Sequence, residues 1–327
     1  MAPPEWVVAL LSRAELMPLD AQPLTGGVSS DVWRVRLSSG ESVVVKRAVE
    51  RLRVQAHWVA PLERNTFEAR YLARAAGIVP SFTPRVVVAD EDLHAFAMTD
   101  LGPLPSWRDD LASGRIDPSV GSALGGRLAT VHARTAGDAT AASEFASDDL
   151  FETLRIEPYL RYTAQRLPEH AAVLSQLADD LAATHIALVH GDVSPKNVIV
   201  TQDGPVLTDA ECAWYGDPAF DLAFCLNHLL LKRIWKPTHR DLLRETSANL
   251  LATYLQGVSW EPPDAVAARA ARLLPALVLA RIDGRSPVDY LSAAQRDSLR
   301  TSAGQALDES ATDPLAITHH IEELAVR

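Results

Sequence analysis

The sequence has few cysteines, and it has no long apolar run. Its two cysteines, Cys212 and Cys225, are too few for a disulfide framework in 327 residues, so a reducing setting is expected. No apolar run is long enough to cross a bilayer. The first residues lack the basic start and apolar core of a signal peptide. We therefore expect a cytoplasmic protein with no membrane partner.

Positive charge is also in short supply. The chain has 31 Lys and Arg against 42 Asp and Glu, which gives a formal net charge of −11. Without an overall positive field to attract phosphate backbones, nucleic acid is not expected as the main partner. A Rossmann oxidoreductase is excluded as well, because no Gly-x-Gly-x-x-Gly stands between a strand and a helix. The length predicts one large or two modest globular domains, and the sequence does not indicate a number of subunits.

What the sequence does have is a polar stretch between short apolar runs. A loop with Asp192 and Asn197 follows one apolar run, and a second apolar run leads away from it. A turn at residues 202–205 then returns the chain through a third run to Asp209. This pattern predicts a hairpin with polar residues gathered at one end. We therefore expect Asp192, Asn197 and Asp209 to lie together.

These residue types at this spacing suit phosphoryl transfer from ATP. Asp192 would orient and deprotonate the attacking hydroxyl, while Asn197 and Asp209 would hold Mg²⁺ against the phosphates. Glu211 is a further candidate metal ligand. Lys196 lies four residues after Asp192 and either stabilises the transferring phosphate or is a solvated loop lysine. The competing interpretation is a buried polar hairpin in an ordinary α/β domain. It is disfavoured because each further residue that fits the phosphoryl-transfer pattern makes a coincidental match less frequent.

His190-Gly191-Asp192 with Asn197 and then Asp209 resembles the catalytic and metal-binding loops of the aminoglycoside phosphotransferase and choline kinase superfamily. These are small-molecule relatives of the protein kinases. The resemblance implies an α+β, two-lobed, protein-kinase-like fold with a small antiparallel-sheet N-lobe and a larger, mostly helical C-lobe. It also implies ATP and Mg²⁺ as cofactors and a small-molecule hydroxyl as the acceptor. His190 would support the catalytic loop or contact the substrate.

Two further motifs refine the resemblance. Residues 209–211, Asp-Ala-Glu, are similar to the Asp-x-Glu pattern of methylthioribose kinases. The Asp-Phe-Gly and Ala-Pro-Glu motifs of protein kinases are absent from the sequence, which disfavours a protein kinase. Gly-Asp-Pro at residues 216–218, followed by Asp221, recurs in the aminoglycoside phosphotransferase superfamily. There the matching Asp supports the catalytic loop by hydrogen bonds, and we expect this role for Asp221.

A glycine-containing segment lies near the N-terminus, just ahead of an alternating strand. It includes Gly26, Gly27, Ser29 and Ser30. In the kinases that the sequence resembles, this segment lies over the ATP phosphates, where glycine lets the backbone approach oxygen atoms closely. Taken alone, a Gly-Gly hairpin turn would be the commoner interpretation. With the resemblance, these four residues are candidate nucleotide contacts.

An apolar strand at residues 42–46 ends in a lysine. Lys46 matches the position that holds the α and β phosphates in kinases. Downstream, residues 65–72 have helical spacing and place Glu68 where it can pair with this lysine. The alternative is a solvated lysine at a strand end. We expect a Lys46–Glu68 ion pair.

A breaker-rich segment follows the last predicted strand of the N-terminal half. Kinase-like folds place the hinge between the lobes here, and backbone groups of Met98, Thr99 and Leu101 would then bind the adenine edge. We place the domain boundary at this point. It separates an N-lobe at residues 1–102 from a C-lobe at residues 103–327.

The C-terminal half is predicted to be helical, apart from a loop at residues 135–149 that is rich in Ala, Ser, Thr and Asp. A Gly125–Gly126 pair in the first long helix is expected to permit close packing. Methylthioribose kinases have an Arg-Arg pair followed by Gly that helps bind substrate and phosphate. Here only Arg281 has a counterpart, so it is a candidate substrate or phosphate contact. The alternative is an arginine at a helix C-terminus.

The predicted function is an ATP:alcohol phosphotransferase (EC 2.7.1-like) that acts on a small metabolite or antibiotic. Methylthioribose-like sugars, amino alcohols such as choline and ethanolamine, and aminoglycosides all remain open as acceptors. The acidic residues Glu211 and Asp217 slightly favour a cationic acceptor, and Arg281 slightly favours a sugar. The alternative function is a catalytically inactive nucleotide-binding module of the same fold.

Overall fold

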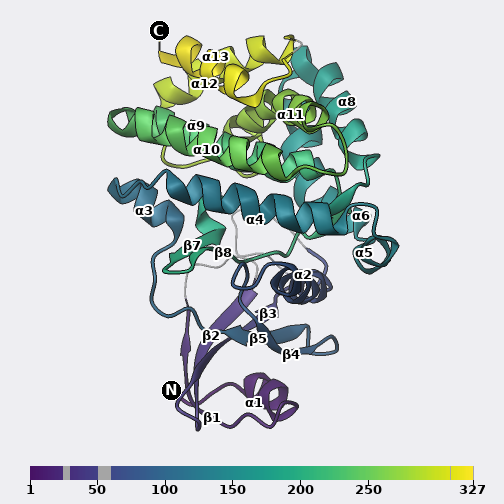
Figure 1. The fold of residues 1–327 in the computed structure, drawn as a ribbon, viewed down its shortest axis with the longest axis vertical. Coiled ribbons are helices and arrows are strands. Elements are labelled where there is room, and N and C mark those ends of the chain that lie inside the picture. Colours follow the sequence, from purple (N-terminus) through teal and green to yellow (C-terminus); the bar gives the residue numbers. More distant parts are fainter. Residues whose placement is uncertain (25–29, 51–59, 310, 327) are drawn as a thin grey trace.

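The computed structural model describes residues 1–24, 30–50, 60–309 and 311–326. Two parts are stacked along its long axis, a small part built on a β-sheet and a larger part built mostly from helices (Figure 1). The N-terminus lies in the sheet part, and the C-terminus lies at the opposite end of the molecule. The expected α+β fold with a small antiparallel-sheet lobe and a larger helical lobe is confirmed.

Within the described residues, the small part holds one antiparallel sheet of five strands in the order β1-β2-β3-β5-β4. Its elements are α1 (Glu5–Ser12), β1 (Pro18–Pro23), β2 (Ser30–Leu37), β3 (Ser42–Ala48), α2 (Arg64–Ile78), β4 (Val86–Asp90) and β5 (Ala95–Thr99). Successive side chains of a strand point to opposite faces. Ala95 and Ala97 of β5 pack in a core with α1. Phe96 between them joins the large core that includes Tyr71 of α2. The sheet is therefore covered on both faces.

Helices dominate the chain after the sheet. They are α3 (Trp107–Ser113), α4 (Ser119–Thr135), α5 (Ala139–Glu144), α6 (Asp148–Phe151), α7 (Tyr162–Arg166), α8 (Ala171–Ala182), α9 (Pro218–Trp235), α10 (Arg240–Gly257), α11 (Pro263–Asp283), α12 (Ala293–Leu307) and α13 (Pro314–Val326). Shorter helical segments of other types are η1 (Glu152–Arg161), a π-helix, and the 3₁₀ turns η2 (Pro168–His170), η3 (Pro195–Asn197) and η4 (Pro237–His239). Among the described residues, no helix is both long enough and apolar enough to cross a membrane.

The loop predicted at residues 135–149 contains helix α5 instead, so that prediction was wrong. The side chain of Asp138 caps this helix by accepting hydrogen bonds from the backbone N–H groups of Thr140 (2.8 Å) and Ala141 (3.2 Å). Two apolar side chains, Ala141 and Phe145, are fully buried in the large core. A cap and two buried contacts outweigh a composition typical of loops.

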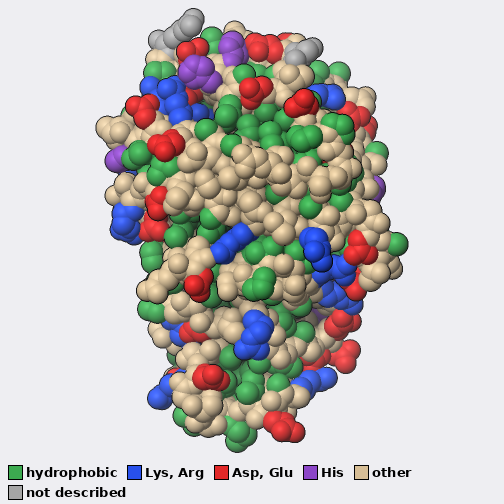
Figure 2. All heavy atoms as spheres, in the orientation of Figure 1, with side chains coloured by type: hydrophobic (Ala, Val, Ile, Leu, Met, Phe, Trp, Pro, Cys, Tyr) green, Lys and Arg blue, Asp and Glu red, His purple; other side chains and the backbone are tan. Residues whose placement is uncertain are grey.

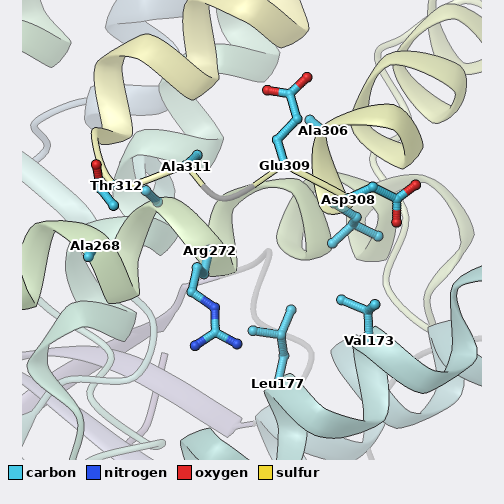
Figure 3. Close-up of a pocket in the computed structure, with 11 residues that line it drawn as sticks. Val173, Leu177, Ala268, Arg272, Ala306, Asp308, Glu309, Ala311 and Thr312 are labelled. Carbon is cyan, nitrogen blue, oxygen red and sulfur yellow. The ribbon is translucent and has the colours of Figure 1, made fainter.

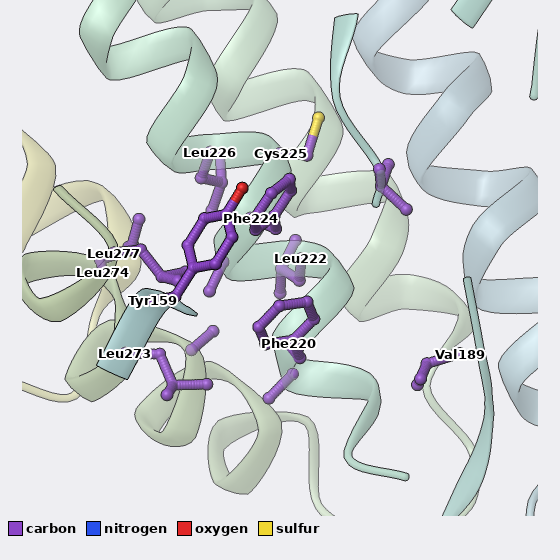
Figure 4. Close-up of a cluster of buried hydrophobic side chains, with 14 of the residues drawn as sticks. Tyr159, Val189, Phe220, Leu222, Phe224, Cys225, Leu226, Leu273, Leu274 and Leu277 are labelled. Carbon is purple, nitrogen blue, oxygen red and sulfur yellow. The ribbon is translucent and has the colours of Figure 1, made fainter. Parts of the chain in front are cut away.

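Helix α9 runs through the centre of the helical part and is buried on almost every side. It begins as predicted at a Gly-Asp-Pro turn, where the Asp217 side chain accepts a hydrogen bond from Ala219 N at 2.9 Å. Phe220 and Phe224 of this helix lie beside Tyr159 in the core (Figure 4). A helix that is apolar all round needs partners on all sides, and α10, α11 and α13 supply them.

Helices α4 and α10 pack against each other through glycine. A Cβ atom at Gly125 would lie 2.3 Å from the carbonyl oxygen of Leu250, and one at Gly121 would lie 2.3 Å from that of Thr246. At Gly126 a Cβ would meet nothing within 4 Å. The prediction of close packing at the Gly125–Gly126 pair is therefore confirmed for the first glycine and wrong for the second.

The connection between the two parts lies between β5 and α3, since the last strand ends at Thr99 and the next helix begins at Trp107. The boundary predicted near Gly102 falls in this connection and stays a prediction. On the face shown in Figure 2, acidic and basic side chains are interspersed with hydrophobic ones. The net charge of −11 is therefore not concentrated in one patch of this face.

Candidate active site

The predicted hairpin is present and is built from β7 (Val198–Thr201) and β8 (Gly204–Leu207). A second small sheet, which sequence reasoning missed, pairs β6 (Ala187–Val189) with β9 (Trp214–Gly216). The loop with Asp192 lies between these two sheets in the chain. Strand β6 precedes the loop and β7 follows it, so each end of the loop is attached to a strand of one of these two sheets.

The backbone of this loop is held by Asp221, in the first turn of α9. Its two carboxylate oxygens accept hydrogen bonds from His190 N at 2.7 Å and from Gly191 N at 2.8 Å. Gly191 has φ +76°, and a Cβ there would lie 2.4 Å from the carbonyl oxygen of Cys212. A side chain is excluded at this position by both conformation and space.

His190 joins the loop to the strand that precedes Asp209. Its Nδ1 accepts a hydrogen bond from Asp192 N at 3.1 Å, and its Nε2 donates to the carbonyl oxygen of Thr208 at 3.1 Å. The ring is fully buried and meets the ring of Tyr71 edge-on. Burial lowers the pKa of His190. Both nitrogens therefore serve a neutral ring that positions the loop, and the ring has no free nitrogen to touch a substrate.

Asp192 is buried, and two cations contact its carboxylate. Arg155 Nη2 and Lys196 Nζ each lie 3.0 Å from Asp192 Oδ2. Burial raises the pKa of Asp192, but Lys196 and Arg155 outweigh this effect and hold the pKa well below its ordinary value. The side chain of Lys196 is 51% exposed, so this lysine is both a partner of Asp192 and open to solvent.

Arg155 is the residue of this site that sequence reasoning missed. It lies on the π-helical segment η1, a geometry that is often found at functional sites. Besides contacting Asp192, it donates through Nε to the carbonyl oxygen of Gly191 and through Nη1 to that of Leu154 (2.7 Å). No motif marks the position, because it lies 37 residues before Asp192 on a separate element. The proline at 158, inside a predicted helix, is the only local signal.

The candidate metal ligands are Asn197, Asp209 and Glu211. Asn197 donates its side-chain N–H to the carbonyl oxygen of Asp192 at 3.0 Å, which leaves its amide oxygen as the atom that can bind a cation. Asp209 has φ +64°, an uncommon conformation for a residue other than glycine and one that is often found at functional sites. Arg64 Nε lies 3.3 Å from Glu211 Oε2 and holds that carboxylate.

These residues fit Mg²⁺ only together with phosphate oxygens. Within the described parts of the chain, no three His, Cys, Asp or Glu side chains lie close enough to hold a metal ion. Mg²⁺ commonly binds through one or two carboxylates and completes its shell with substrate phosphates and water. Asp209 with the amide oxygen of Asn197 matches that pattern, and Glu211 is close in the chain.

Lys46 lies between two carboxylates. Its Nζ is 2.7 Å from Glu68 Oε2, which is the expected ion pair, and it also contacts Asp209 Oδ1. Burial lowers the pKa of Lys46, but Asp209 and Glu68 outweigh burial and raise it. The structure thus connects the strand lysine, the α2 glutamate and the hairpin aspartate in one network.

A cleft of about 600 Å³ lies between the sheet and the hairpin. Met98, Thr99 and Leu101 line it, as do Ile199 and Thr208 from the helical part. The three predicted adenine contacts therefore line one cavity with Ile199, which follows the Asp192 loop, and with Thr208, which precedes Asp209. Its size suits a nucleoside.

The remaining predicted residues are placed as follows. Gly26, Gly27 and Ser29 lie outside the described residues, and Ser30 is the buried first residue of β2. Arg281 donates to the backbone oxygen of Ser286 and, at 3.0 Å, to its hydroxyl, so it stabilises the turn after α11.

The carboxylate of Asp217 caps α9 and is bound by Arg269 at 2.8 Å, so it belongs to the fold. Of the two acidic residues that slightly favoured a cationic acceptor, Asp217 therefore no longer counts, and Glu211 remains. A separate hollow of about 300 Å³, lined by Val173, Leu177 and Arg272 among others, lies in the helical part (Figure 3). None of the predicted site residues lines it.

Comparison with known proteins agrees with this geometry. The family model described as the phosphotransferase enzyme family matches residues 20–265. The methylthioribose kinase of Pectobacterium carotovorum subsp. carotovorum (strain PC1) is 27% identical over 241 residues, which cover 64% of this chain and 60% of that protein. The chain thus spans about 60% of the length of the curated relatives it matches.

Solved structures share the fold. The aminoglycoside phosphotransferase from Alicyclobacillus acidocaldarius subsp. acidocaldarius DSM 446 has a TM-score of 0.57 at 16% identity, and the match covers 99% of this chain and 98% of that one. The amicoumacin kinase hAmiN, in complex with AMP-PNP, Ca²⁺ and Ami, has a TM-score of 0.54 at 12% identity and covers 97% of both chains. With the family model spanning more than half of its length, the chain belongs to the phosphotransferase enzyme family.

Proposed function

We propose that this chain is an ATP-dependent small-molecule kinase that transfers the γ-phosphate of ATP to a hydroxyl of a small acceptor. The observation that carries the proposal is the carboxylate of Asp192, which is buried, contacted by Arg155 and Lys196, and held beside the candidate metal ligands. The cleft lined by Met98 reaches Thr208, the neighbour of Asp209. The two halves of a phosphoryl-transfer site are thus adjacent.

Each residue of the site has a separate proposed role in binding Mg-ATP. When bound, Mg²⁺ would neutralise phosphate charge, with Asn197 and Asp209 as its ligands and Glu211 as a further candidate. Lys46, held by Glu68, would bind the α and β phosphates.

Asp192 would accept a hydrogen bond from the acceptor hydroxyl and aim its oxygen at the phosphorus. Its pKa lies below the ordinary value. It therefore stays ionised and takes the proton only as the new P–O bond forms, which suits a loose transition state.

The relatives support the reaction class. The curated relative cited above is named a methylthioribose kinase, and the amicoumacin kinase was solved with an ATP analogue and a divalent cation. Sugars, amino alcohols and aminoglycosides remain the candidate acceptors within this class. A site that keeps the lysine, the carboxylates and the amide of phosphoryl transfer favours an active enzyme over an inactive nucleotide-binding module.

The proposal is tested by measuring ADP release from Mg-ATP with a panel of acceptors. The panel holds methylthioribose, other small sugars, choline, ethanolamine, homoserine and aminoglycosides. Asp192→Asn should abolish the acceptor-dependent signal, while Asp203→Asn, at an exposed position in the turn of the same hairpin, should leave it unchanged. Tight Mg-ATP binding with no transfer to any acceptor would favour the inactive module. A chain that binds no ATP would contradict both.

A further inference from the structure

The buried cationic side chains of this protein differ in whether a carboxylate lies within ion-pair distance. Among the described residues, five Lys or Arg side chains are buried: Lys46, Arg64, Arg155, Lys232 and Arg233. Four of them have a carboxylate within ion-pair distance, as shown by Glu68 for Lys46 and Asp192 for Arg155. Lys232, which is 4% exposed, has none within the described ranges. The residues outside those ranges include no Asp or Glu, so no side-chain carboxylate is hidden there.

The surroundings of Lys232 are aromatic and positive. Its Nζ lies 3.6 Å from the centre of the Tyr290 ring and 4.5 Å from that of Trp235. Burial, and to a lesser extent the charge of Arg108, lowers the pKa of Lys232 to about 8. The charges of Arg281 and Lys236 also contribute to this lowering, whereas the charge of Asp289 opposes it. The hydroxyl of Tyr290 is buried and makes no hydrogen bond to any described residue. An unpaired buried ammonium costs free energy, and a site with such a cost often binds a ligand of opposite charge.

Lys232 is connected to the catalytic loop along one face of α9. Phe224, His228 and Lys232 are spaced four residues apart and so lie on the same side of the helix. The rings of Phe224 and His228 are 5.0 Å apart. Burial lowers the pKa of His228, and the charges of Arg281, Asp192, Lys196 and Lys232 all act on it. His228 is therefore close enough to both Asp192 and Lys232 for their charges to act on its ring.

Arg281 is close enough to Lys232 and His228 for its charge to lower the pKa of both. It has no carboxylate within ion-pair distance among the described residues, and its Nε is buried without a hydrogen-bond partner there. Its guanidinium lies 5.9 Å from the Tyr159 ring, and the guanidinium of Arg155 lies 5.7 Å from the same ring. Arg155, which contacts Asp192, and Arg281 therefore lie near the same aromatic ring.

We propose that the acceptor carries an anionic oxygen group, a carboxylate or a phosphate, in addition to its reacting hydroxyl, and that Lys232 together with Arg281 binds this group. The inference rests on the proposed kinase function, because it names the acceptor class of the same site. It disfavours cationic acceptors, since an aminoglycoside or choline would bring positive charge against Lys232 and Arg281, neither of which has a carboxylate partner among the described residues. The unpaired tyrosine hydroxyl of Tyr290 supplies a further donor.

The first experiment measures anion binding without turnover. With the nucleotide site saturated by Mg-AMP-PNP, inorganic phosphate is titrated calorimetrically into wild type, Lys232→Met and Arg272→Met. Lys232→Met should weaken phosphate binding at least about tenfold. Arg272→Met, at a half-exposed arginine that pairs with Asp180, should not change it. Lys232→Arg, which keeps the charge, should restore most of the affinity.

Thermal unfolding of the same variants separates recognition from a structural role. The pKa of Lys232 in the folded protein lies below its unfolded value, so burying the charged form costs stability at every pH below about 8. Lys232→Met should therefore leave Tm at pH 7 unchanged or raise it. A lower Tm with unchanged phosphate binding would show that Lys232 only packs on its aromatic neighbours, and it would overturn the proposal.

The second experiment compares matched acceptors in the ADP-release assay. D-glucose, 6-amino-6-deoxy-D-glucose and D-glucuronate carry a neutral, a positive and a negative group at the same carbon, C6, and ribose with ribose 5-phosphate compares a hydroxyl with a phosphate at C5. The anionic members should have the higher kcat/KM, and Lys232→Met should remove that preference. A preference for 6-amino-6-deoxy-D-glucose, or wild type that binds no phosphate in the first experiment, overturns the proposal. Failure of the kinase function itself would show differently, as absent Mg-ATP binding or absent ADP release.

Discussion

Two buried carboxylates in the helical part of the molecule are each surrounded by cations. Asp192 contacts Arg155 and Lys196, and Glu322 of α13, which is 1% exposed, lies 2.9–3.3 Å from three arginines of α9 and α10. The partners of Glu322 are helical residues, and the cluster attaches the last helix to the fold. Asp192 instead lies in a loop that is fixed by a fully buried aspartate and a neutral histidine.

The comparison shows that charge and burial alone do not mark a catalytic group. Both carboxylates are buried, and both have cations within contact distance. What differs is the backbone that carries them and what lies beside them, namely an uncommon conformation at Asp209, a nucleoside-sized cleft and candidate metal ligands. Removal of each carboxylate should therefore affect different measurements.

The largest expected effect is on catalysis. Asp192→Asn keeps the size of the side chain but removes the charge that orients the acceptor, so kcat should fall by about 10²–10⁴-fold. Tm should also fall, because the buried Arg155 loses its carboxylate partner, but the backbone hydrogen bonds of the loop to Asp221 and His190 remain, so Mg-ATP binding should be kept at temperatures well below the new Tm. The check is steady-state ADP release together with thermal unfolding. Near-full activity in this variant would remove Asp192 from the mechanism.

Glu322→Gln should lower stability and leave catalysis in place. Burial lowers the pKa of Arg233 to about 10, although Glu322 opposes the effect, and without this carboxylate the buried arginine has no counter-charge within ion-pair distance in the described part of the chain. Stability should fall by ~3–5 kcal/mol, as for other buried pairs that lose one partner. Denaturant unfolding measures the loss, and kcat/KM at a temperature well below the new Tm should stay near the wild-type value. A large drop in kcat/KM with unchanged stability would show that Glu322, like Asp192, acts in catalysis, and it would contradict the comparison.

A smaller effect is expected from Arg155→Met. Lys196 and Arg155 hold the pKa of Asp192 below its ordinary value, so the loss of Arg155 should raise that pKa and move the acid limb of the kcat/KM profile to higher pH. Activity should then be lost as pH falls through the acidic range, and should be least affected at alkaline pH. Arg161→Met, on the same π-helical segment but paired with Glu152 and Asp179, should leave the limb in place.

The smallest effects are expected where α4 packs on α10, away from both carboxylates. Gly125→Ala would place a Cβ 2.3 Å from the carbonyl oxygen of Leu250, so stability should fall by ~1–3 kcal/mol. Gly126→Ala meets open space and removes a helix-weakening glycine, so stability should rise by ~0.5–1 kcal/mol. Thermal unfolding of the pair measures both signs. Equal shifts in one direction would contradict the packing described here.

The parts of the site that lie close together in sequence could be predicted, and the parts supplied by distant helices could not. The hairpin, the start of α9 and the Lys46–Glu68 contact follow from apolar runs, turn residues and motif spacing. Arg155 could not be found in this way, because its direction depends on a π-helical turn and on how η1 packs against the loop. The helix within residues 135–149 was hidden by a composition typical of loops, since buried contacts decided its conformation.

Helix α9 carries Asp221, which holds the catalytic loop, near its beginning and Lys232 near its end. The two positions are eleven residues apart, which corresponds to a rise of ~16 Å along a straight helix. The surrounding core keeps this helix from bending, so the spacing between loop and lysine is fixed by the scaffold. If Lys232 binds the anionic group as proposed, the acceptor is selected by its length as well as by its charge. An anion too short to span from Lys232 to the transferred phosphate would then not react.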